Sequence, residues 1–308
     1  MKHFHLLLVA TGIMVVASCH FTDIDNCSYQ NPGSRQVVEI NASLEESKST
    51  KTARKVDGRI YWTPSDEINV FFGTDKGKFT STNTDDALFA KFSGSLLITS
   101  VVGVNEGGAD NNCLWGLYPY DEDAVLFNGE ISTKLSENQI GVAGTFPNHT
   151  YITLAKNNSF SLGFYNVLTG FKFSVRRSGI ISVTFSGNNN EALAGSLKLT
   201  FGDDLRPVVK SISDGKTLLT LTPENGEFIV GEEYYFLMVP TTFSKGFTLK
   251  MTNSENKEGV FKYTQSVLFA RNKFIRKVNV DEGVDFKTRR DDLISGPGKN
   301  ENVVYDIW

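Results

Sequence analysis

The sequence predicts an all-β fold, either a sandwich or a barrel, and three observations support this prediction. Among the 308 residues Phe numbers 23 and Gly 27, whereas Pro numbers only 8. Long alanine-rich or leucine-rich segments with helical period are missing. Short segments in which apolar and polar residues alternate follow one another closely, separated by Gly, Asn, Asp and Ser. This spacing is typical of sandwiches and barrels and not of alternating strands and helices.

The N-terminal segment has the pattern of a bacterial lipoprotein signal over residues 1–18. Lys2 gives a positive start, residues 6–16 are apolar apart from one Thr and one Gly, and Ala17-Ser18-Cys19 follows. The run is shorter than the roughly 20 apolar residues that span a bilayer, and it ends on small residues, as a cleaved signal does. The cysteine resembles a lipobox, which implies that Cys19 carries diacylglycerol and becomes an acylated N-terminus. The alternative is an ordinary cleaved signal with a coincidental cysteine.

Charge and residue content argue against several functions. Lys and Arg total 31 against 35 Asp and Glu, without a basic face interleaved with aromatics, so nucleic acid is not an expected partner. Only His20 and His149 follow the signal, and His149 lies in a Pro-Asn-His-Thr segment that we expect to be a solvated loop. A His-dependent nucleophile would have to use it. We therefore predict no enzyme activity, no cofactor and no metal site.

Acidic pairs and aromatic residues keep two other functions open. Three pairs of carboxylates could serve glycoside hydrolysis or calcium binding, but each lies in a turn-like stretch, which favours a solvated turn. These pairs are Asp121 with Asp123, Asp203 with Asp204, and Asp291 with Asp292. Four aromatics could form a sugar-stacking platform, although aromatics at alternating strand positions usually belong to a core. They are Trp62, Trp115, Tyr118 and Tyr120.

The remaining cysteines, Cys27 and Cys113, do not form a disulfide framework. Cys113 alternates with Trp115 and Leu117 on one face of an expected strand, so we interpret it as a small core residue. Cys27 lies in the polar leader. A disulfide between them is the alternative, but two cysteines are too few to hold a fold together.

The chain divides into a tether, two domains and a tail. Residues 19–34 are a polar tether, residues 35–157 the first domain, residues 158–280 the second domain and residues 281–308 the tail. The first strand is expected over residues 37–44, where four apolar side chains alternate with polar ones: Val38, Ile40, Ala42 and Leu44. Residues 45–58 are hydrophilic without apolar periodicity, which is typical of a loop that proteases cut.

Three segments of the second domain carry specific expectations. Residues 234–240 are apolar on both faces and predict a central strand covered on each side. Residues 247–263 predict a hairpin around the turn at 253–259. The basic segment 271–277 is interpreted as a solvated strand edge, where Lys and Arg discourage unwanted pairing.

These landmarks, in this order and behind a lipobox, resemble the fimbrillin family of Bacteroidetes surface lipoproteins. The matching segments run through most of the chain: Trp62 with Asp66 and Ile68; Phe92-Ser93-Gly94; Leu117-Tyr118-Pro119-Tyr120; Leu135 with Gln139; residues 164–173; Leu193-Ala194-Gly195; Tyr234-Tyr235 with Val239-Pro240; and Gly246-Phe247. The family usually has Gly where Ser65 stands, and the tail after Val280 is longer than in plainer members.

The resemblance implies two β-sandwich domains of transthyretin-like type and an outer-membrane, surface-exposed, lipid-anchored subunit of a fimbria. In pilin members, cleavage after an Arg releases the first strand, and a terminal strand of another subunit fills the groove. Carried over to this chain, the cut falls after Arg54, with Arg35 and Arg59 as rivals. The donor segment comprises Val303, Val304, Tyr305, Ile307 and Trp308.

The partners implied are other pilin subunits, the membrane through the lipid anchor, and a host or bacterial surface ligand. Both terminal segments could instead pair permanently within their own subunit. A monomeric, anchored glycan-binding or adhesive lipoprotein is the alternative function. An anchored hydrolase would require a pocket with convergent carboxylates.

Overall fold

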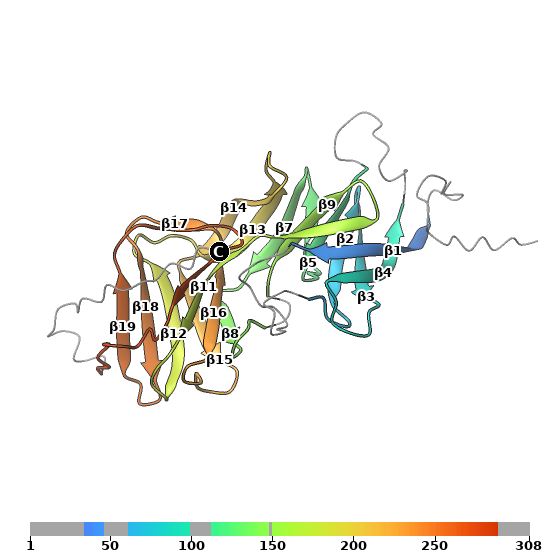
Figure 1. Ribbon diagram of the computed structural model, residues 1–308. Coiled ribbons are helices and arrows are strands. Elements are labelled where there is room, and N and C mark those ends of the chain that lie inside the picture. The colour runs from blue at the N-terminus through green and yellow to red at the C-terminus, as the bar shows by residue number, and fades with distance from the viewer. Residues whose placement is uncertain (1–33, 46–60, 99–111, 148–149, 289–308) are drawn as a thin grey trace, which may run out of the picture.

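The computed structural model describes residues 34–45, 61–98, 112–147 and 150–288. As the sequence predicts, this part of the chain is all β, in several sheets. It contains no helix of the length and apolarity needed to cross a bilayer. The sheets form an elongated molecule with two halves, which the early strands and the late strands build at opposite ends (Figure 1).

A closed sheet of seven strands forms the first half, in the hydrogen-bonded order β1-β10-β9-β5-β2-β3-β4. The sheet closes because β1 pairs with both β10 and β4. Its strands are β1 (Arg35–Leu44), β2 (Glu67–Phe72), β3 (Asp75–Ser81), β4 (Phe89–Leu97), β5 (Leu114–Tyr118), β9 (Thr153–Asn157) and β10 (Ser161–Asn166).

Four smaller sheets form the second half, in the orders β19-β18-β12-β15-β8, β14-β13-β7-β6, β16-β11-β21 and β17-β20. Their strands are β6 (Val125–Phe127), β7 (Glu130–Leu135), β8 (Asn138–Gly141), β11 (Thr169–Ser174), β12 (Ile180–Gly187), β13 (Ala194–Phe201), β14 (Pro207–Lys216), β15 (Leu218–Pro223), β16 (Glu233–Met238), β17 (Thr241–Phe243), β18 (Phe247–Asn253), β19 (Glu258–Tyr263), β20 (Val267–Phe269) and β21 (Phe274–Lys277).

Strand pairing crosses the division expected between residues 157 and 158 in both directions. β10 lies beyond that point but pairs with β1 and β9 in the closed sheet. β7 and β8 lie before it but pair with β13 and β15 of the second half. The two halves are therefore interleaved along the sequence.

Alternating side chains of the closed sheet pack in two different cores. Phe72 and Leu114 point into the closed sheet, where Trp62 packs edge-on against Phe92 at 4.9 Å between ring centroids. Their neighbours Phe71 and Trp115 belong to the core of the second half. Because successive side chains of a strand face opposite sides, β2 and β5 serve both cores at once. The two halves consequently pack as one body.

Several sequence expectations are confirmed locally, and one is wrong in part. β1 buries Val38, Ile40 and Ala42 as predicted, and β18 and β19 form the predicted hairpin. β16 is covered on both faces, but it lies at an edge of its sheet and not at the centre. The side chain of Gln139 satisfies that edge, since its amide accepts from Leu237 N at 2.9 Å and donates to Leu237 O at 2.7 Å.

Ser65 lies in the left-handed region of the backbone, with φ of 64°. A residue with a Cβ adopts this region at a cost, whereas Gly does not. This conformation gives a physical reason for the glycine that the fimbrillin pattern usually carries at this turn.

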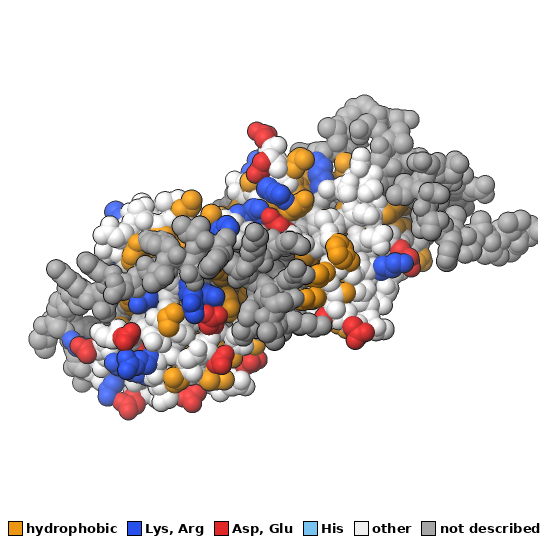
Figure 2. Space-filling view, viewed as in Figure 1, with side chains coloured by type: hydrophobic (Ala, Val, Ile, Leu, Met, Phe, Trp, Pro, Cys, Tyr) orange, Lys and Arg blue, Asp and Glu red, His pale blue; other side chains and the backbone are white. Residues whose placement is uncertain are grey.

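The visible surface mixes both signs of charge. Lys and Arg side chains lie among Asp and Glu side chains over the described part of the face shown in Figure 2. This mixture agrees with the near balance of 31 basic and 35 acidic residues. The described part of this face therefore offers no basic stripe of the kind that tracks a nucleic-acid backbone.

Candidate strand-exchange site

β1 is the strand whose place in the sheet matters most for the function that the sequence resemblance implies. It runs antiparallel to β4 through nine residue pairs, from Arg35 opposite Leu97 to Ser43 opposite Phe89. On its other side it pairs in parallel with β10 only from Asn41 onward. Residues 35–40 of β1 thus pair with β4 alone, residues 41–43 with both neighbours and Leu44 with β10 alone. Its removal would leave β4 and β10 with unpaired edges.

The inward side chains of β1 fill the closed sheet. Ile40 is 0% exposed and Ala42 2%, whereas outward-facing Val37 is 80% exposed. Burying a Val or Ile side chain stabilises a fold by about 2 kcal/mol. Loss of β1 would therefore open an apolar groove whose pockets match every second residue of an incoming strand.

Arg35 anchors the beginning of β1. Its guanidinium donates to Asp75 Oδ1 at 2.6 Å, to Lys76 O at 3.0 Å and to Ser95 O at 2.7 Å. The Asp75 carboxylate also accepts from Leu97 N at 2.7 Å. Arg35, a rival for the processing site, is thus a paired strand residue whose side chain is already engaged. A protease would need both its backbone and its side chain to be free.

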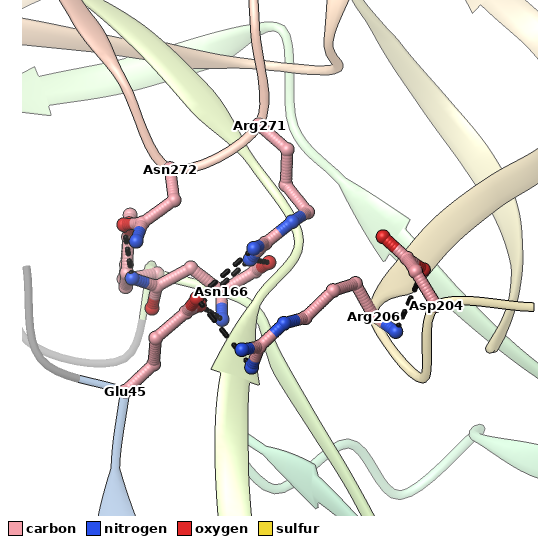
Figure 3. A network of polar contacts seen from close by, with 7 residues as sticks. Glu45, Asn166, Asp204, Arg206, Arg271 and Asn272 are labelled. Carbon is pink, nitrogen blue, oxygen red and sulfur yellow. Dashed lines mark hydrogen bonds and ion pairs between the residues drawn. The ribbon is translucent and has the colours of Figure 1, made fainter. Parts of the chain in front are cut away.

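Glu45 anchors the end of β1 through a second set of contacts (Figure 3). Its carboxylate accepts from both Nη atoms of Arg271, at 2.7 and 2.9 Å, and from Asn166 N at 3.0 Å. Arg206 Nη1 lies 3.9 Å from the same carboxylate. The Glu45 side chain is 14% exposed and that of Arg271 is 22% exposed. Such two-point, partly buried pairs are among the stronger polar contacts in proteins.

The contact with Glu45 favours the charged form of Arg271. The hydrogen bond to the Glu45 carboxylate raises the pKa of the Arg271 guanidinium, while burial acts in the opposite direction. The charged form therefore dominates at every ordinary pH. Arg271 also donates to Asn166 O at 2.6 Å, so its guanidinium hydrogen-bonds groups at the end of β1 and at the end of β10.

Two turns of the second half place the arginines. Arg271 and Asn272 form the turn before β21, and Asn272 N donates to Leu168 O at 2.8 Å. Arg206 ends the turn between β13 and β14, where Asp204 Oδ1 accepts from Arg206 N at 3.0 Å. The Arg206 guanidinium lies over the ring of Tyr165, 4.3 Å from its centroid. Both turns thus converge on the end of β10.

The predicted site residues themselves lie outside the described residues. This holds for Cys19, Arg54, its rival Arg59, and the donor segment Val303, Val304, Tyr305, Ile307 and Trp308. It also holds for Cys27, His149 and the Asp291 pair. Cys113 is described and packs, partly buried, against the core of the second half, as expected.

Sequence reasoning misses Glu45, Arg206 and Arg271. It assigns Glu45 to the hydrophilic loop and Arg271 to a solvated strand edge, but the two side chains are only 14% and 22% exposed, so their expected exposure to solvent is wrong. β21 does lie at a sheet edge, but Phe274 and Ile275 are buried in it. The only local signal is the position of Glu45 directly after an alternating strand.

Two expected aromatics of the sugar platform are buried. Trp62 is 0% exposed and Trp115 2%, each in a different core. The hydroxyl of half-buried Tyr118 donates to Asp66 Oδ1 at 3.2 Å. Lys78 lies 4.8 Å from the centroid of the Tyr120 ring. These four side chains do not form one exposed stacking surface.

The carboxylate pairs that the structure describes act within turns. Asp121 Oδ2 accepts from the Thr133 hydroxyl at 2.7 Å, and its Oδ1 accepts from Asp123 N at 2.9 Å. Asp121 borders a groove of about 950 Å³ between the halves, but its oxygens are engaged in holding the turn. Among the described residues, no group of three or more His, Cys, Asp or Glu could hold a metal ion.

No family model and no curated protein matches the chain. Three similar solved structures cover most of it. A provisionally assigned cell adhesion protein of Bacteroides ovatus is 15% identical, with a TM-score of 0.42 over 82% of this chain and 96% of that chain. One of Bacteroides uniformis is 15% identical, with a TM-score of 0.44 over 81% and 95%. The tip fimbrial protein Mfa3 of Porphyromonas gingivalis, with a C-terminal truncation, is 7% identical, with a TM-score of 0.40 over 82% and 98%.

Proposed function

We propose that this chain is a subunit of a bacterial fimbria, exposed at the outer membrane, that polymerises by strand addition. Cys19 carries the lipid that tethers the precursor. Cleavage after Arg54 separates β1 from the rest of the chain, and a strand of a neighbouring copy takes its place. The main-chain groups of β4 and β10 supply affinity, and the pockets vacated by alternate side chains supply specificity.

The position of β1 carries this proposal. It is the strand that closes the seven-stranded sheet, and Arg54 lies in the segment between it and the next described residue, Tyr61. A single cut in that segment would leave β1 held only by non-covalent contacts. The burial of Trp62 and Trp115 supports this function over the glycan-binding alternative, which needs exposed aromatics.

A disulfide between β1 and β4 tests the proposal. Glu39 and Ser93 are directly opposite each other in the antiparallel pair. Opposite residues of such a pair have Cα atoms about 4.5–5.5 Å apart, within the range that a disulfide spans. The variant Glu39→Cys/Ser93→Cys should be cut normally by a trypsin-like protease but polymerise only after reduction, because oxidation keeps β1 in place.

The matched control places the same crosslink in the second half. Lys250 and Val260 are opposite each other in the β18–β19 hairpin. Lys250→Cys/Val260→Cys should polymerise equally well oxidised and reduced. Polymers from the oxidised Glu39→Cys/Ser93→Cys protein, seen on a non-reducing gel, would contradict the release of β1.

A further inference from the structure

The groups that hold the Glu45 carboxylate do not belong to β1. Asn166 N belongs to the last residue of β10, and Arg206 and Arg271 come from turns of the second half. All three would remain in place when β1 leaves. In Figure 3 they converge on one point beside the end of β1.

The site that Glu45 would leave empty is suited to binding a carboxylate. The two Nη atoms of Arg271 reach the two oxygens of Glu45 separately, Asn166 N adds a third donor, and Arg206 adds positive charge. A planar fork with two parallel donors matches a carboxylate. Without Glu45, the partly buried Arg271 guanidinium still donates to the neutral carbonyl of Asn166 and keeps the weaker electrostatic attraction of Asp204, but it loses its hydrogen-bonded counter-ion. Leaving a partly buried charge unpaired is unfavourable, so the open groove should prefer an incoming strand that brings an acid.

We propose that this cradle, formed by Arg271, Arg206 and Asn166 N, is a carboxylate receptor that binds Asp306 of the neighbouring copy. The inference rests on the proposed function, since the acid must arrive on an exchanged strand.

The chain itself supports the choice of Asp306. The end of β1 reads Ala42-Ser43-Leu44-Glu45, an apolar residue, any residue, an apolar residue and an acid. Val303-Val304-Tyr305-Asp306 repeats this pattern. The match covers the end of β1, where Ala42 and Ser43 pair on both sides and Leu44 pairs with β10. The match does not extend further toward the start of β1, because Glu301 would then stand at the place of buried Ile40. The match also implies that the incoming strand runs as β1 does, with Tyr305 at the place of Leu44 and Asp306 at that of Glu45.

Polymerisation of protease-treated full chains tests this inference. Asp306→Asn should slow fibre growth at least about tenfold, because the amide removes the charge and keeps the shape. Asp292→Asn, fourteen residues earlier and outside the exchanged strand, is the matched control and should leave growth unchanged. Arg271→Lys keeps the positive charge but loses the two-point guanidinium contact. The double variant Arg271→Lys/Asp306→Asn should therefore grow less than about threefold more slowly than Arg271→Lys alone.

Binding of synthetic peptides provides a second readout that does not depend on fibres. The probes are residues 299–308 with Asp or Asn at position 306, and residues 35–45 with Glu or Gln at position 45. Each is offered to the cut protein, and the acidic form of each should bind at least about tenfold more tightly. Equal affinities for the two 299–308 peptides would overturn the receptor while leaving strand addition intact. If neither 299–308 peptide binds while the 35–45 peptide does, the donor role of the tail fails, and this inference fails with it.

Discussion

Glu45 and Arg271 form a two-point ion pair although 226 residues separate them in the chain. The pair joins the first residue after β1 to the turn before β21. It therefore ties the strand that closes the first half to the second half of the molecule. The contact at the other end of β1, between Arg35 and Asp75, stays within the closed sheet.

The two anchors should differ in strength. Glu45→Gln leaves Arg271 without its counter-ion in a partly buried place, and we expect a loss of about 1–3 kcal/mol in the free energy of unfolding. Asp75→Asn removes the partner of Arg35, whose side chain is 46% exposed, so its loss should be below about 1 kcal/mol. Urea unfolding of the uncut protein measures both. An equal loss in the two variants would show that Glu45–Arg271 is no more than a surface pair.

Glycines of the strands beside β1 should respond unequally to substitution. A Cβ on Gly94 of β4 would come within 2.5 Å of Lys78 O and of the Phe79 ring. Gly94→Ala should therefore lower the free energy of unfolding by about 1–3 kcal/mol through overpacking. Gly163 of β10 has nothing nearer than 3.8 Å, so Gly163→Ala is the control and should change stability little. Similar melting temperatures for the two variants would contradict this packing.

Tyr234 should make the protein sensitive to alkali. Burial raises the pKa of its hydroxyl, and the hydrogen bond from Ile229 N acts in the opposite direction. The folded state thus holds this proton more tightly than the unfolded chain. Its contribution to stability is complete below the ordinary pKa of 10.0 and is lost as pH rises through the folded value. Unfolding free energies measured from about pH 8 to about pH 12 should fall less steeply in Tyr234→Phe than in the wild type; parallel curves would refute this role.

Cleavage should depend on one arginine of the segment between β1 and Tyr61. Arg54→Ala should fold normally, with an unchanged melting temperature, but should not assemble, because β1 stays covalently attached. Arg59→Ala, in the same segment, should be processed and should polymerise as the wild type does. Normal fibres from the Arg54→Ala protein would show that cleavage occurs at another residue.

The parts of the fold that depend on local alternation can be predicted from the sequence. β1, with Ile40 and Ala42 inward, and the β18–β19 hairpin follow from a period of two and from turn residues. The closure of the first sheet could not be predicted in this way. It depends on Leu44 lying beside Phe164 of β10, a pairing between distant segments that leaves no periodic signal.

The candidate site is half predictable for the same reason. A first strand followed by a protease-sensitive segment is an expectation from residues 37–58, and the exchange of that strand is what the family resemblance implies. The cradle at its end is not, because Arg206 and Arg271 each look like ordinary surface charges in their own segments. Only the folded turns bring them to Glu45.

The mass and N-terminal sequence of subunits taken from the outer membrane of the native host would test strand exchange most directly. Our account predicts a chain that begins at Lys55, with β1 absent from assembled fibres. A lipid-modified chain that begins at Cys19 in every molecule, with β1 still attached, would contradict it and would make the protein a permanently anchored monomer or accessory subunit.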